Sequence, residues 1–192
     1  MSTNDYSATS CSEQYFNMFI RPDQEAFAKG KKETDELKAA YSEAGESDRL
    51  AGISLYSAKG QYTTAIDKRT SFNKRLDDLR AEKKLAEDNA RKAALAKGMS
   101  IEEADRMAER AGKCVQSKID SLIFMYSSDL QAGVSKTQNV FTQASEENKT
   151  AHSQYMSASL DLDRSLFDQQ MRASDINKNM GFYTFLKQAE QS

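Results

Sequence analysis

Small and apolar residues recur in an unbroken three–four rhythm between Ala51 and Ala93, and this rhythm constrains the fold more than any other feature of the chain. Alternating steps of four and three place such residues on one stripe of a helix, as at the a and d positions of a coiled coil. No proline interrupts the run, so it predicts one long helix that packs along this stripe. The stripe comprises Ala51, Leu55, Ala58, Tyr62, Ala65, Arg69, Phe72, Leu76, Leu79, Lys83, Ala86, Ala90 and Ala93.

The segment after this run predicts a helix end followed at once by a helix start. Gly98 follows a basic last turn, where glycine commonly ends a helix. Ser100 and Glu103 then form a Ser-x-x-Glu capping box. So short a connection favours two antiparallel neighbouring helices.

A second stripe of small and apolar residues begins at Ile101 and reaches Leu166. Between residues 122 and 134 it moves in steps of four, so it drifts round the helix instead of following a strict heptad. Gly133 lies in this drift and predicts a bend. A polar run near residues 146–150 is a second place where the helix could break.

The sequence therefore predicts an all-α fold, namely an elongated antiparallel helical hairpin or coiled-coil-like bundle of about three long helices with aromatic terminal segments. Pro22 is favourable in a first helical turn, and Gly45 suits the position after a helix end. The expected helices span residues 22–44, 46–97 and 101–178. The expected divisions are a polar N-terminal extension with an apolar cluster (1–21), the elongated helical bundle (22–178) and a C-terminal aromatic segment (179–192).

No spacing of residues points to catalysis, so we expect no enzyme, no cofactor and no metal site. His152 has Lys149 three residues before it, where a carboxylate-bridged metal site on a helix needs a glutamate. The eight glycines form no phosphate-binding loop. Cys114 is a candidate for covalent cofactor attachment on residue type alone, whereas its flanks favour a small residue at a packed helix face, and Cys11 is expected to be an exposed thiol.

The charges and the hydropathy limit the partners of the chain. With 27 basic and 29 acidic residues, the net charge of −2 gives no positive field for nucleic acid. No run approaches the roughly 20 apolar residues that cross a bilayer, so we expect no transmembrane segment. The first ten residues have neither the basic leader nor the apolar core of an ordinary secretory signal, and we expect a cytoplasmic or organelle-interior location.

Two terminal groups of aromatic residues are the best candidates for partner binding. About half of the stripe at 51–93 is alanine, whose methyl group contributes about 0.8 kcal/mol when buried, against roughly 1.5–3 kcal/mol for Leu or Phe. A core this thin is expected to gain stability against a partner, and aromatic side chains commonly anchor interfaces. The alternative is that they close the ends of the protein's own bundle. The predicted partner-binding residues are Tyr15, Phe16, Phe19, Phe182, Tyr183 and Phe185.

These features favour a non-catalytic structural linker or scaffold that docks other proteins in a larger assembly, with self-association as one form of partnership. One alternative is a secreted or translocated bacterial coiled-coil protein that interacts with host or envelope partners, with the Ser- and Thr-rich N-terminus as its export address. A helical-bundle enzyme or metal carrier is the third hypothesis, and the ligand spacing that it needs is missing.

Overall fold

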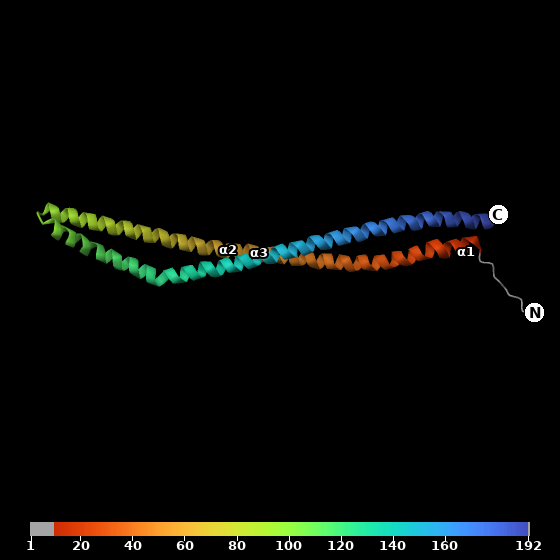
Figure 1. Ribbon diagram of the computed structural model, residues 1–192, viewed down its shortest axis with the longest axis horizontal. Helices are drawn as coiled ribbons and strands as arrows, with labels where there is room; N and C mark the ends of the chain where they lie inside the picture. The colour runs from red at the N-terminus through yellow and green to blue at the C-terminus, as the bar shows by residue number, and fades with distance from the viewer. Residues whose placement is uncertain (1–9, 192) are drawn as a thin grey trace, which may run out of the picture. The chain divides into compact units, whose positions relative to one another are not determined.

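The computed structural model describes residues 10–191, and these residues are helical almost throughout. The helix α1 (Cys11–Tyr15) leads through a π-helical turn η1 (Phe16–Ile20) into α2 (Arg21–Ala96), and α3 (Ile101–Glu190) follows after a short turn (Figure 1). Residues 10–191 contain no strand, so the prediction of an all-α fold is confirmed. The two long helices pack against each other as an antiparallel hairpin. The predicted export address and most of the polar extension lie outside the described residues.

The prediction of about three long helices is imprecise, because α2 continues through the expected helix end at Gly45. A Cβ at Gly45 would lie 3.5 Å from the ring of Tyr155 on α3, so the absent side chain leaves room for that ring. Packing against α3 thus sustains a helix whose local sequence is typical of a helix end. Helix α3 likewise continues through Gly133 and through residues 146–150, where a break was predicted.

The helical chain also begins before Pro22, where the sequence predicted a helix start. Ser10 caps α1, since its Oγ accepts a hydrogen bond of 3.2 Å from the Glu13 N–H. A proline inside a helix lacks an N–H, and its ring clashes with the carbonyl four residues earlier, here that of Met18. The turn η1 ends two residues before Pro22, and its wider π-helical geometry gives the proline ring room.

The chain divides into two compact units, which we describe separately. Unit 1 comprises Met1–Leu50 with Lys149–Ser192, and unit 2 comprises Ala51–Asn148. In each unit a stretch of α2 is paired with a stretch of α3. The described part of unit 1 is joined by polar and aromatic contacts, whereas the largest apolar core lies in unit 2.

A buried polar layer centred on Thr34 joins the two helices of unit 1. Thr34, which is 1% exposed, donates a hydrogen bond of 2.9 Å to the Gly30 carbonyl. Its hydroxyl lies 2.7 Å from that of Ser165 and accepts a hydrogen bond from the Gln169 amide. These side chains are all satisfied in one register, so the layer favours this alignment of α2 with α3.

Most of the predicted stripe of α2 faces α3 in unit 2. Ala58 and Leu76 are buried, Arg69 is exposed, and the other members are half-buried apart from Ala93. Ala94 is buried in place of Ala93, because a helix with 3.6 residues per turn drifts from a 3.5-residue repeat. The core of this unit consists of Leu76, Val115 and Ile119, with Phe72, Leu79 and Leu122 packed around it.

Two charged residues one helical turn apart on α2, Lys83 and Glu87, also lie beside α3. Lys83 and Glu87 are half-buried and 3.7 Å apart, and Lys83 donates a hydrogen bond of 2.8 Å to Gln116 on α3. The Glu87 side chain occupies the space that a side chain at Gly112 would fill. The glycine therefore lets the Glu87 carboxylate pack between the helices.

The predicted turn between the long helices is confirmed. Gly98 has a φ of 78°, and the Met99 N–H donates to the Ala94 carbonyl at 3.2 Å, which closes a Schellman motif. The Ser100 N–H donates to a Glu103 carboxylate oxygen at 3.0 Å, and the Ser100 Oγ accepts from the Glu103 N–H. The Ser100 hydroxyl also donates to the Glu103 carboxylate, at 2.9 Å. The bonds from the Ser100 N–H and hydroxyl to the carboxylate lower the pKa of Glu103, and together with the bond from the Glu103 N–H they form a complete capping box at the start of α3.

We expect Gly98→Ala to lower the free energy of unfolding by about 1 kcal/mol, because an alanine side chain is strained at positive φ. Gly60→Ala is the matched control. Gly60 lies inside α2 and has no atom within 4 Å of an added Cβ, so its replacement should raise the stability by roughly 0.5–1 kcal/mol. Urea unfolding followed by circular dichroism measures both changes, and a shift of the same sign in the two variants would contradict the explanation.

Candidate protein-docking sites

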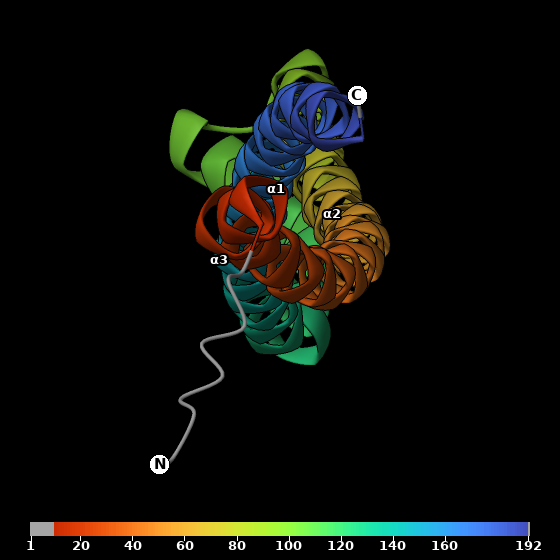
Figure 2. The same ribbon diagram turned by 90° about the vertical axis from the view of Figure 1, so that its right-hand side faces the viewer.

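All six predicted partner-binding residues come together in unit 1, where α1 and η1 lie beside the C-terminal end of α3 (Figures 1 and 2). Tyr15 contacts Phe19 and Phe182, with ring centroids 4.9 Å apart in both pairs. Phe16 lies 5.4 Å from Tyr183. We call this group the terminal aromatic cluster; it comprises Tyr15, Phe16, Phe19, Phe182, Tyr183 and Phe185.

The terminal aromatic cluster has an inner and an outer part. Tyr15, Phe16 and Tyr183 are half-buried and join the two helices. Phe19, Phe182 and Phe185 remain 47%, 49% and 62% exposed. The inner residues therefore close this end of the helix pair, and the outer ones present apolar rings to solvent.

Hydrogen bonds hold the cluster in place. The Tyr15 hydroxyl donates to the Asn179 side chain at 3.1 Å, and Asn179 donates to Asp23 at 3.4 Å. Ser12, which is 2% exposed, donates to both carboxylate oxygens of Glu190, from its Oγ at 2.6 Å and from its N–H at 2.9 Å. This clasp ties the start of α1 to the end of α3.

The clasp should loosen in acid. Its hydrogen bonds from the Ser12 hydroxyl and N–H lower the pKa of Glu190. A carboxyl group whose pKa is lowered by folding stabilises the folded state above its unfolded pKa, and this contribution is lost as the pH falls through the folded pKa. We expect hydrogen exchange at Ser12, corrected for intrinsic rates, to speed up as the pH falls below the ordinary glutamate pKa of 4.5. Glu190→Gln should remove this pH dependence, and an unchanged profile in that variant would contradict the assignment.

A second apolar surface runs along α3 in unit 1, on the side away from α2. Its four members are spaced by four, seven and four residues, so they share one helix face. That face is roughly opposite the one that carries Leu162 and Ser165, which lie on the seam with α2. We call it the outer stripe; it comprises Met156, Leu160, Phe167 and Met171, which are 48%, 65%, 61% and 50% exposed.

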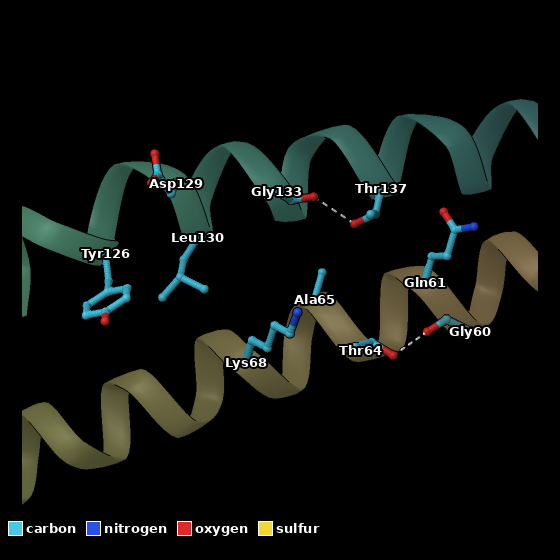
Figure 3. A pocket seen from close by; sticks show the side chains of 10 residues that line it. All are labelled: Gly60, Gln61, Thr64, Ala65, Lys68, Tyr126, Asp129, Leu130, Gly133 and Thr137. Atoms are coloured by element: carbon cyan, nitrogen blue, oxygen red, sulfur yellow. Dashed lines mark hydrogen bonds between the residues drawn. The ribbon is translucent and has the colours of Figure 1, made fainter.

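A pocket of about 590 Å³ opens in unit 2 where the stripe of α3 drifts in steps of four (Figure 3). Residues 123–129 are all exposed, so α3 makes few apolar contacts with α2 along this stretch. Gly60 and Gly133 leave space on the two walls, and an added Cβ at either would meet nothing within 4 Å. The lining consists of Gly60, Gln61, Thr64, Ala65, Lys68, Tyr126, Asp129, Leu130, Gly133 and Thr137.

The remaining residues considered from the sequence lie apart from these sites. His152 is exposed, with its Nδ1 3.3 Å from an Asp48 carboxylate oxygen. Cys114 is exposed on α3 instead of packed at a helix flank, and Cys11 is exposed as predicted. Within residues 10–191, no three His, Cys, Asp or Glu side chains are grouped as metal ligands would be. No helix in this range is long and apolar enough to cross a membrane.

Sequence reasoning missed the outer stripe and the pocket. The outer stripe could have been found by testing α3 for a second apolar face, since its spacing is visible in the sequence. The four-residue steps of the apolar stripe between residues 122 and 134, and Gly133 within them, coincide with the pocket, but they did not predict a cavity. In comparisons with models of protein families, with curated proteins and with solved structures, nothing matched this chain.

Proposed function

We propose that this chain is a non-catalytic structural protein that docks other proteins in a larger assembly, with the terminal aromatic cluster as its anchor. The observation that carries the proposal is the exposure of three phenylalanine rings held in place by an ordered inner layer. Aromatic anchors of this kind contribute much of the binding energy in protein interfaces. Because the cluster is already assembled in the free chain, little ordering entropy is lost on binding.

The light packing of the helix pair supports this proposal. Of the ten buried apolar residues in the described part of the chain, five are alanines. Each buries little apolar area, while ordering each residue of the backbone costs about 1–2 kcal/mol. A chain of this kind gains stability by covering further apolar surface with a partner. The outer stripe offers such surface at a spacing that suits a helix of another protein.

The proposal is tested with the tagged full chain in lysate of its source cells. The variant carries Phe19→Ser, Phe182→Ser and Phe185→Ser, all at exposed positions. The matched control carries Tyr56→Ser, Leu85→Ser and Phe124→Ser, which are 82%, 61% and 88% exposed in unit 2. Circular dichroism verifies that both variants remain helical, and quantitative mass spectrometry compares the co-purifying proteins.

We expect the cluster variant to lose the proteins that the natural chain and the control variant both retain. A third variant, Leu160→Glu with Phe167→Glu, reports whether the outer stripe contributes to the same interaction. Retention of an unchanged set of proteins by the cluster variant would refute the proposed anchor.

A further inference from the structure

The pocket in unit 2 has the size and the lining of a small-molecule site. Its volume of about 590 Å³ falls within the range of roughly 300–1,000 Å³ that is typical of ligand pockets. Leu130 and Tyr126 project from α3 toward α2, and Ala65 projects from α2 toward α3 (Figure 3). The floor between the helices is therefore apolar.

Some polar groups of the pocket have hydrogen-bond partners within the protein, and others do not. The hydroxyls of Thr64 and Thr137 each donate to a carbonyl of their own helix, those of Gly60 and Gly133, at 2.9 Å. Among the described residues, Lys68 has no carboxylate within ion-pair distance, and its ammonium group points into the space between the helices (Figure 3). The pocket thus carries a cationic donor that has no partner.

The Lys68 ammonium group favours an anionic group of the ligand. The Lys68 side chain extends toward Ala65 and away from Tyr126, whose ring points from α3 toward α2, and the Asp129 side chain points away from the space between the helices (Figure 3). Charge-assisted hydrogen bonds from an ammonium group to a carboxylate are about twice as strong as those between neutral groups. The ligand that complements this lining has an apolar body and one carboxylate.

We propose that the pocket binds an amphiphilic monocarboxylate, such as a medium-chain fatty acid. Its chain lies between Ala65 and Leu130 and extends toward the Tyr126 ring, and its carboxylate accepts a hydrogen bond from Lys68. The two glycines fit this role, because each costs the helix about 1 kcal/mol relative to alanine while its missing side chain keeps the pocket open. This inference concerns unit 2 and does not depend on the terminal aromatic cluster in unit 1.

Calorimetric titration of the full chain with decanoate, below the concentration at which it forms micelles, tests the proposal. We expect saturable one-to-one binding, with changes in the amide NMR signals of Gly60 and Gly133. Gly133→Leu should abolish binding by filling the pocket, and because leucine is a better helix former than glycine this variant should fold at least as well. Gly181→Leu is the matched control, since it also adds a side chain where nothing lies within 4 Å, outside this pocket.

Decanol separates the role of the charge from that of the chain. We expect Lys68→Gln to weaken decanoate binding about tenfold and to leave decanol binding unchanged, because only the acid uses the ammonium group. Lys59→Gln, one position outside the lining, should alter neither. Absence of decanoate binding, equal binding by Gly133→Leu, or equal affinity for acid and alcohol would overturn the proposal. Binding of an acidic apolar peptide at this pocket without binding of decanoate would also overturn the proposal.

Discussion

Replacing Ile119 with alanine is expected to lower the free energy of unfolding by about 3 kcal/mol. Ile119 is 4% exposed and packs with Leu76 and Val115 in the largest apolar core of unit 2. The substitution removes buried methyl and methylene groups and leaves a cavity between two helices that pair through few other large side chains. Urea unfolding followed by circular dichroism measures the loss.

The matched control for this substitution is Ile123→Ala, one turn further along α3. Ile123 is 36% exposed, so the same chemical change should cost less than about 1 kcal/mol. Comparable losses in the two variants would contradict the placement of the core at Ile119 and would indicate a different rotation of α3.

Thr34→Val should lower the free energy of unfolding by about 2 kcal/mol, because it removes the hydroxyl at the centre of the buried polar layer. Valine has a shape similar to that of threonine, so the loss of stability in this variant measures the contribution of the hydrogen bonds. Gln169 and Ser165 lose their partner across the helix pair, and groups left unsatisfied near the interior are costly. Denaturant unfolding and hydrogen exchange of unit 1 measure the effect.

Thr34→Ser separates the hydroxyl from the rest of the side chain. Serine keeps the donor and acceptor, so this variant should lose well under half as much stability as Thr34→Val. If both substitutions cost the same, the buried methyl group and not the polar layer would account for the contribution of Thr34.

The pairing of the helices in unit 2 could be read from the sequence because it follows from helix geometry. The three–four rhythm identified the face of α2 that meets α3, including buried Ala58 and Leu76. The turn at Gly98 and the capping box at Ser100 were legible because each depends on a few neighbouring residues. Local interactions of this kind are encoded within one or two helical turns.

The errors arose where a contact distant in sequence or an irregular helical turn overrides the local preference. Gly45 is typical of a helix end, yet the ring of Tyr155 packs over it and α2 continues. Pro22 is typical of a helix start, and the preceding π-helical turn allows the helix to extend past it. In both cases the deciding neighbour, or the wider turn, is not apparent from local propensity.

The composition of the terminal aromatic cluster was predictable, whereas its division into inner and outer residues was not. Aromatic residues near the N-terminus and the C-terminus of the chain meet because the two helices of the hairpin are antiparallel. Which of them face solvent depends on rotation of the helices, so only the structure distinguishes exposed Phe185 from half-buried Tyr183. The same rotation places the outer stripe on the side of α3 away from α2.

Side-chain footprinting of the chain, purified alone and within its native assembly, tests the docking function most directly. We expect strong labelling of Phe19, Phe182 and Phe185 in the isolated chain and protection of all three in the assembly. Tyr56 and Phe124, exposed in unit 2, should be labelled equally in both states. Equal labelling of the three phenylalanines in the two states would contradict the account.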